Sequence, residues 1–279
     1  MRIALTTAFL LCPLAPASLS LANQAQTEDQ PVPAPAELDP ARVKVAVEQL
    51  EKAFKKGDTI DRSLAIEENA KIFDGEVANL IAKGLKDKEE SVQLTAIEAL
   101  RFFEHEKALD ALHSTAKRDK KMRKEPELFK ALIKAIGQHA NPDSIEILGD
   151  NLWSPADHGV IQARILGLGN IRAKESVEEL ISMMHKAGWR KVQPFMEDFR
   201  VALVNLTGED QGKSQPKWTE WWNDVKKTLE VSEEASSMPK AMQRKWERYW
   251  DIEVEAKEGE EPEEKDDEKK RKRRKRGDD

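Results

Sequence analysis

The chain has 279 residues, of which 35% are charged and 39% are hydrophobic, and its formal net charge is −6. An average globular chain carries about 25% charged residues, so this composition argues against an integral membrane protein. It still supplies enough Leu, Ile, Val and Ala for a core. The acidic balance excludes a nucleic-acid binder that acts through its bulk charge. Cys12 is the single cysteine. The chain has seven Trp residues and one Tyr.

The first 22 residues have the pattern of a secretory signal peptide. Arg2 precedes an apolar run over residues 3–11, and small residues follow. This run is too short to span a membrane as a helix. The small-x-small rule places the cleavage between Ala22 and Asn23, or else after Ala17. The run could also be a buried helix, or Cys12 could anchor a lipoprotein, although Leu11 precedes it where a small residue is required.

Cleavage at either position would remove Cys12 and leave the mature chain without cysteine. Disulfides, thiolate zinc sites, iron–sulfur clusters and a cysteine nucleophile would then be excluded. We therefore expect an exported protein, periplasmic or extracellular, that is stabilised by core packing alone. We expect no transmembrane segment after signal cleavage.

The rest of the chain divides into three parts. Residues 23–38 are rich in Gln, Pro and Ala and predict an extended linker. Residues 39–250 show helical periodicity throughout, and Asp39-Pro40 predicts the first helix start. Residues 251–279 form a charged tail, in which eleven acids and two lysines over 251–268 precede eight consecutive basic residues. A tail of this composition is predicted to be disordered.

A repeat runs through the helical part. Four segments align, and their last residues are Leu100, Ile136, Leu168 and Leu206, at offsets of 36, 32 and 38. Since one helix pair cannot bury its own apolar face, regular helix pairs predict a stacked array. The fold class is therefore all-α, an α-α superhelix (solenoid) of about five helix pairs. The aligned segments cover 95–100, 131–136, 163–168 and 201–206; second helices are predicted over 106–117, 142–153 and 174–186, and an earlier pair over 60–73 and 75–86.

Small residues recur within these segments. Ala99, Ala135 and Gly167 precede the aligned apolar residue in three of the four, and they are predicted to let paired helices approach closely. Gly137 and Gly169 follow the aligned residue, where a helix is predicted to end.

One unit carries a family resemblance. Its first helix reads Asp157-x-x-Val160-x-x-Ala163-x-x-Leu166-Gly-Leu168-Gly169, and its second reads Val177-x-x-Leu180-Ile181. This unit resembles a HEAT repeat, and weaker similarity extends over roughly residues 60–210. The resemblance implies a HEAT-like solenoid that binds other proteins. Tetratricopeptide repeats have a similar period, but their Trp/Leu-Gly-Tyr pattern is absent.

The array is predicted to end in a tryptophan-rich segment over about 208–250. Leu206-Thr207-Gly208 followed by Trp218-x-x-Trp221-Trp222 resembles the ending of exported bacterial HEAT-repeat proteins. Trp218, Trp221 and Trp222 fall on one helical face and are predicted to cap the last repeat. The alternative is an aromatic platform for a ligand such as a carbohydrate. A further helix with Met242, Trp246 and Trp250 is predicted to pack onto this cap, or else to dock a partner.

No motif in the sequence assigns catalytic chemistry. His-Glu-x-x-His, a P-loop and Gly-x-Ser-x-Gly are missing, so we assign no catalytic residue, metal site or cofactor. Asp157-His158 could supply metal ligands, but Asp157 is better explained as a helix N-cap. Ser214 and Ser237 each begin a Ser-x-x-Lys sequence and are also predicted to be N-caps. Asn205 lies in a formal glycosylation sequon and is expected to stay unmodified.

These observations predict a non-enzymatic, monomeric scaffold that binds a protein or peptide partner through a groove formed by the second helices. One alternative is a tether to an anionic surface, anionic polymer or nucleic acid through the basic tail. Another, implied by the HEAT resemblance, is a lyase like the phycobilin lyases. The residues of the basic run are Lys269, Lys270, Arg271, Lys272, Arg273, Arg274, Lys275 and Arg276.

Overall fold

The computed structural model describes residues 39–252. The predicted signal peptide with its cleavage site at Ala22 and Asn23, the linker, and the tail beyond residue 252 lie outside the described residues. Over residues 39–252 the chain is helical without a strand, which confirms the all-α prediction. None of the described helices combines the length and hydropathy that a membrane span requires.

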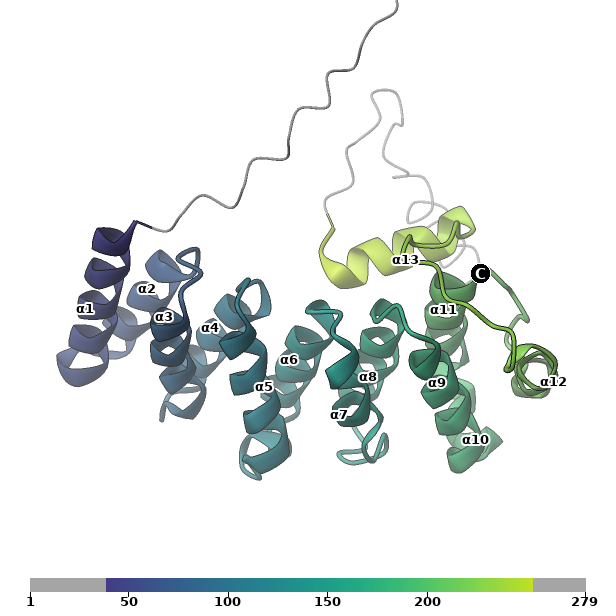
Figure 1. Cartoon of the computed structure of the whole chain (residues 1–279). Helices are drawn as coiled ribbons and strands as arrows, with labels where there is room; N and C mark the ends of the chain where they lie inside the picture. The colour runs from purple at the N-terminus through teal and green to yellow at the C-terminus, as the bar shows by residue number, and fades with distance from the viewer. Residues whose placement is uncertain (1–38, 253–279) are drawn as a thin grey trace, which may run out of the picture. The chain divides into compact units, whose positions relative to one another are not determined.

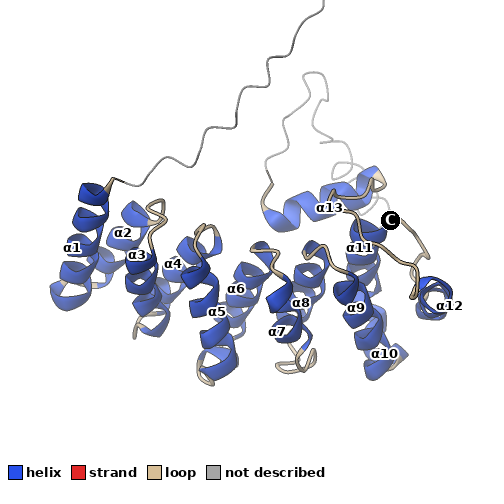
Figure 2. Ribbon diagram, viewed as in Figure 1, coloured by secondary structure: helices blue, strands red, loops and turns tan. Residues whose placement is uncertain are grey.

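The helices of the described part form two layers (Figure 1). Each first-layer helix contacts the next first-layer helix, and the second-layer helices contact one another in the same order. This arrangement is the superhelix of about five helix pairs that the repeat predicts. Figure 2 shows that the described segments between the helices are loops and that no strand is present among them. The first layer comprises α2 (Thr59–Asn69), α4 (Glu90–Arg101), α6 (Pro126–Gln138), α8 (His158–Asn170) and α11 (Met196–Thr207). The second comprises α1 (Pro40–Lys56), α3 (Gly75–Ile81), α5 (Glu106–Arg118), α7 (Ile145–Gly149) and α9 (Lys174–Ala187).

Several helices begin at side chains that accept hydrogen bonds from free backbone N–H groups. Asp39 caps α1 and Asp157 caps α8, as predicted. Ser214 caps α12 (Gln215–Val225), also as predicted. Ser237 does not cap α13 (Lys240–Trp250), which begins after Pro239 without a side-chain cap, so that prediction is wrong. An N-cap hydrogen bond is worth about 1 kcal/mol, and α13 lacks this contribution because Pro239 occupies its N-cap position.

The glycines of the repeat bring neighbouring first-layer helices together. A Cβ atom on Gly137 of α6 would lie 2.7 Å from the Cα of Gly167 in α8. One on Gly169 would lie 2.6 Å from the Cβ of Ala202 in α11. Of the small residues predicted to let paired helices approach, Gly167 instead serves a close contact between successive pairs, and the prediction for Ala99 and Ala135 stays untested. Gly137 and Gly169 do lie in the last helical turns, but neither has a positive φ.

A ladder of side-chain hydrogen bonds links the ends of the first-layer helices. The last carbonyls of a helix have no partner within it. In this array a side chain from the following first-layer helix donates to one of them. The three bonds run from His139 Nε2 to Leu100 O (2.9 Å), from Asn170 Nδ2 to Gly137 O (3.0 Å) and from Asn205 Nδ2 to Gly169 O (2.9 Å).

The second helix predicted over residues 142–153 is much shorter than expected. The chain makes a 3₁₀ turn, η3 (Pro142–Ser144), and then α7 ends at Gly149. Asp150 has extended backbone angles and Asn151 has a φ of 48°, which no α-helix accommodates. The helical spacing of apolar residues up to Trp153 predicted more helix than the backbone allows.

Further short elements fill the connections. Gly188 has a φ of 71°, in the left-handed region that favours glycine, and it ends α9. A short insertion that the repeat pattern did not predict then leads to α11. These short elements are η1 (Ala82–Lys86), η2 (Met122–Lys124), α10 (Trp189–Val192) and η4 (Gln193–Phe195).

The last helix, α13, lies across the first layer (Figure 1). The ring of Trp250 lies against Gly137, and the ring of Trp246 lies against Gly169. The prediction that this helix packs onto the tryptophans of α12 is therefore wrong. Glycines without a Cβ atom leave room for an indole ring, so the small residues of α6 and α8 also explain where α13 is seated.

Candidate functional site

The three predicted cap tryptophans lie together where the array ends. Trp218 is fully buried, and its Nε1 donates to Gly212 O at 2.9 Å. Its ring meets that of Trp221 edge-on at 5.5 Å, and Trp221 and Trp222 are half-buried. Their helix α12 contacts α9 of the second layer. A fully buried Trp218 presents no ring face to a ligand, so this placement favours the capping role over the aromatic platform.

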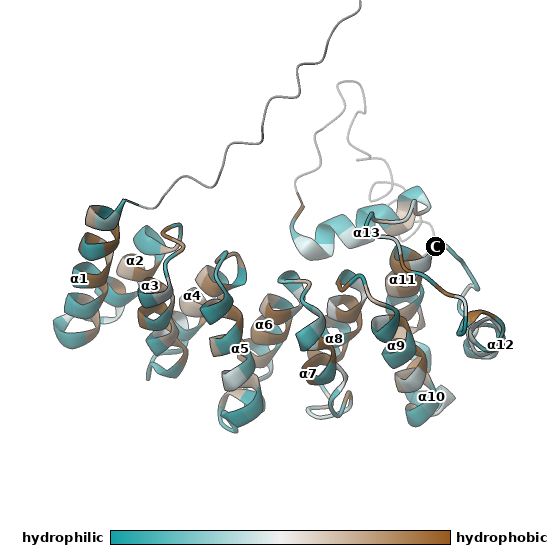
Figure 3. Ribbon diagram, viewed as in Figure 1, coloured by the Kyte–Doolittle hydropathy of each residue, from teal (hydrophilic) through white to brown (hydrophobic). Residues whose placement is uncertain are grey.

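Helix α13 covers the first-layer surface. Met242, Trp246 and Trp250 are buried on its inner side. In Figure 3 the outer side of α13 is hydrophilic, whereas α6, α8 and α11 beneath it are largely hydrophobic. Burial of two indole rings and a Met side chain contributes several kcal/mol of hydrophobic free energy. The array therefore already has a helix bound on this surface.

Polar contacts hold the C-terminal end and the middle of α13. Arg101 of α4, only 4% exposed, donates to Asp251 at 3.1 Å and to Trp250 O at 3.3 Å. Lys134 of α6 bonds the same Asp251 carboxylate at 2.7 Å. Hydrogen bonds from Lys134 and Arg101 lower the pKa of Asp251. These contacts join the end of α13 to both α4 and α6. In the middle of α13, Lys245 forms an ion pair with the buried Asp198 of α11 at 2.8 Å.

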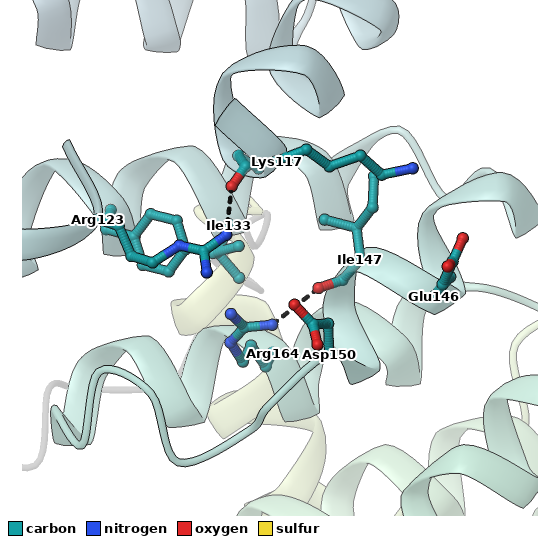
Figure 4. A pocket seen from close by; sticks show the side chains of 9 residues that line it. Lys117, Arg123, Ile133, Glu146, Ile147, Asp150 and Arg164 are labelled. Carbon is teal, nitrogen blue, oxygen red and sulfur yellow. Dashed lines mark hydrogen bonds between the residues drawn. The ribbon is translucent and has the colours of Figure 1, made fainter. Parts of the chain in front are cut away.

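A cavity of about 470 Å³ opens on the other side, between α5, α6, α7 and α8 (Figure 4). It exists because α7 has five residues, whereas α5 has thirteen and α9 has fourteen. Where α7 ends early, nothing fills the space between α5 and α8. The lining residues are Ala116, Lys117, Arg123, Phe129, Ile133, Glu146, Ile147, Asp150 and Arg164.

Arg164 lines this cavity from a core position of α8 and is only 2% exposed. Its Nη1 donates to Ile147 O at 2.8 Å and to Leu148 O at 3.0 Å, two of the last carbonyls of α7. Its Nε has no hydrogen-bond partner within residues 39–252. Burial lowers the pKa of Arg164 to about 10; the nearby Asp150 charge opposes this shift and the Arg123 charge adds to it.

Arg123 and Arg164 both lie over the ring of Phe129. The Arg123 guanidinium lies 5.7 Å from the centre of the Phe129 ring, and that of Arg164 lies 5.6 Å from it. Arg123 also donates to Ala116 O at 2.7 Å. In the part of the chain that the structure describes, neither arginine has a carboxylate oxygen within 4.0 Å. Both arginines thus lack an ion pair within residues 39–252, and Lys117 is a third cation on the cavity wall.

A second hollow, of about 660 Å³, lies next to the cavity along the loops that join successive pairs. Segment 119–123 separates the two, since Met122 and Lys121 line the hollow while Arg123 lines the cavity. The walls of the hollow are mostly charged. Its lining residues are Lys86, Asp87, Lys88, Glu90, Gln93, Asp119, Lys121, Met122, Glu125 and Leu128.

Asp157 caps α8, and the ring of His158 lies 4.7 Å from that of Phe195. Among residues 39–252 no group of three His, Cys, Asp or Glu side chains gathers as metal ligands would. Asn205 is buried, and its amide donates to Gly169 O. The basic run from Lys269 to Arg276 lies beyond the described residues.

The repeat pattern contains one feature that indicates the cavity and that the sequence-based predictions do not use, namely the charged residue Arg164. The repeat places Ala96, Leu132 and Ala202 at the core position that Arg164 occupies in α8. A charged residue at one copy of an otherwise apolar position indicates either a cap or a site.

No protein-family model matches the chain, and no curated protein sequence is similar to it.

Proposed function

We propose that the chain is a non-enzymatic HEAT-like scaffold that binds a segment of a partner protein through its second-layer side. The observation that carries this proposal is that the two sides of the array are not equivalent. The first layer from α4 to α11 is covered by α13, whereas the second layer opens into the cavity between α5 and α8. A partner that approaches the second side of the described array meets this recess.

The size and continuity of the recess support an extended ligand. A cavity of about 470 Å³ lies within the range of about 300–1,000 Å³ typical of ligand pockets. The neighbouring hollow along segment 119–123 extends it, so a peptide could contact both. Mixed charges on the walls suit a polar peptide segment better than a purely apolar helix.

Site-specific photo-crosslinking tests this proposal. A photoreactive residue replaces the exposed Glu146 at the cavity rim, and a matched variant carries it at the exposed Lys55 of α1. We expect one protein to be captured through position 146 and not through position 55, and to bind the purified chain afterwards. Equal capture at both positions, or none at position 146, would contradict the proposal.

The proposed place of action is outside the cytoplasm, on the motivation of the N-terminal signal pattern. The intact mass of the protein purified from its source cell tests this: we expect a chain that begins at Asn23 in the envelope or secreted fraction. A chain that retains Cys12 without a lipid would argue against export.

A second candidate function rests on the eight consecutive cations from Lys269 to Arg276. Such a run raises the local potential and could tether the scaffold to an anionic surface. We expect a chain lacking residues 269–276 to lose salt-sensitive retention on vesicles that contain anionic lipid. Unchanged retention of the truncated chain would dismiss this role.

A further inference from the structure

We propose that the cavity between α5, α6, α7 and α8 is a subsite for a carboxylate of the partner segment, held by Arg123 and Arg164. This inference rests on the proposed function, because it names the chemical group that the second-layer recess takes. The observations that support it are the burial of Arg164, the arrangement of the two arginines and the composition of the walls.

The first observation is a buried cation at an apolar position. Burying a charge without an ion pair is costly, and the other repeats avoid it with Ala96, Leu132 and Ala202. Arg164 nevertheless lies 2% exposed with no carboxylate within 4.0 Å in the described chain. Asp150 acts on Arg164 only at longer range, and an anion in the cavity would supply a direct ion pair.

Capping of α7 accounts for part of this arrangement only. Arg164 uses Nη1 for the two carbonyls of α7, which leaves its Nε without an acceptor. A cap also needs no second guanidinium. Arg123 comes from η2, a different element, and faces the same Phe129 ring at nearly the same distance. Two like charges turned toward one space repel each other until an anion lies between them.

The walls of the cavity suit a carboxylate on a short aliphatic stem. Ala116, Ile133 and Ile147 supply apolar surface, and the arginines provide planar donors that match a carboxylate. The exposed Glu146 and Asp150 at the rim oppose a dianion such as phosphate more strongly than a singly charged carboxylate. A Glu or Asp side chain of a peptide therefore fits better than a phosphoryl group.

Nuclear magnetic resonance of the arginine side chains of the full chain tests the subsite. The probes are N-acetyl-glutamate amide, N-acetyl-glutamine amide and inorganic phosphate. We expect the glutamate probe to shift the Nε–Hε signals of Arg123 and Arg164 in a saturable manner, and the isosteric glutamine probe to leave them unchanged. Equal shifts with glutamine, or stronger binding of phosphate, would overturn the proposal.

Two variants sharpen the test. Arg123→Gln should weaken the binding of the glutamate probe by about tenfold, the effect of losing one charged hydrogen bond. Glu146→Gln with Asp150→Asn should strengthen it, a gain that a damaged fold cannot produce. Unchanged affinity in both variants would overturn the carboxylate subsite.

The outcomes separate this inference from the proposed function. Capture of a partner through position 146 together with no response to the glutamate probe would overturn the subsite and leave the scaffold function in place. Saturable binding of the glutamate probe without any captured partner would support the subsite and contradict the scaffold function.

Discussion

At the scale of single residues, Gly169 shows how little space separates successive first-layer helices. A methyl group there would overlap both the Cβ of Ala202 at 2.6 Å and its Cα at 2.8 Å. The Cα belongs to the backbone of α11, so the neighbour cannot turn away as a long side chain could. The spacing of α8 and α11 therefore depends on this glycine.

Gly169→Ala is expected to lower the free energy of unfolding by about 1–3 kcal/mol through overpacking. Higher helix propensity offsets less than about 1 kcal/mol of this loss. Denaturant unfolding measures it. Gly159→Ala in the same helix is the control, since its Cβ meets mainly the flexible side chain of Lys130; it should be neutral or stabilising. Equal loss in both variants would contradict the close-contact explanation.

His139 makes the stability of the array depend on pH. Burial lowers its pKa below the ordinary value of 6.5, and the hydrogen bond to Leu100 O opposes this only in part. Below pH 6.5 the unfolded chain binds a proton that the folded chain does not, so stability is full above this pH and falls as the pH decreases toward the lowered pKa. Burial lowers the pKa of His113 in the same direction.

His139→Gln is expected to reduce the loss of stability between about pH 7.5 and pH 5.5, because the amide can donate to Leu100 O but does not titrate. The part of the loss in unfolding free energy that the substitution removes cannot exceed about 1.4 kcal/mol for each pH unit. Urea unfolding at the two pH values measures it. The same loss in the variant and the original chain would show that His139 is not the titrating group.

Residue identity alone predicted the helix caps but not the role of Arg164. Asp39, Asp157 and Ser214 act on backbone groups two or three residues away, so local sequence determines them. Arg164 instead bonds carbonyls of α7 that are free only because α7 ends at Gly149. Its role depends on the path of another segment, which local sequence does not show.

At the scale of elements, we expect the apolar side of α13 to contribute more stability than its partly buried ion pairs with Arg101 and Asp198. Trp246 is 6% exposed and lies against Gly169. Trp246→Ala is expected to cost about 3–5 kcal/mol of stability, as a large buried side chain is lost. Trp189→Ala, at a tryptophan that is 47% exposed, is the matched control and should change it by less than about 0.5 kcal/mol.

Thermal and urea unfolding of the two variants provide the measurement. Similar small losses for both would mean that α13 contributes little to the array. Similar large losses for both would instead indicate that Trp189 has a structural role in the insertion after α9.

The existence of α13 could be predicted from sequence, but its position could not. The spacing of Met242, Trp246 and Trp250 defines an apolar stripe for any partner surface. Choosing between α12 and the first layer requires knowing that Gly137 and Gly169 leave room for indole rings. Those two glycines come together only once the pairs are stacked.

At the scale of the whole described array, the two ends are held differently. Among the described helices, α1 packs against α2 and α3, which follow it in the chain. The C-terminal pairs are held by α12 at the end and by α13 across the first layer. In a stacked array each pair is stabilised by its neighbours, so opening should begin at the less supported end.

Hydrogen exchange followed by mass spectrometry is expected to show faster exchange in α1–α3 than in α6 and α8. In Trp246→Ala, exchange should rise in α8 and α11 and stay unchanged in α1. A uniform exchange rate along the array, or an increase at α1 alone, would contradict this order of opening.

The reach of α13 also affects the order in which the chain can fold during its synthesis. Each helix pair can pack on the preceding pair soon after it emerges from the ribosome. Arg101, however, meets Asp251 only when 150 further residues have been made. A chain that stops anywhere before α13 leaves this guanidinium with Glu98 as its carboxylate partner but without Asp251, and it leaves the first layer uncovered. Completion of α13 thus separates a chain whose first layer is covered from a truncated chain, which would expose the apolar surface that proteases and chaperones bind.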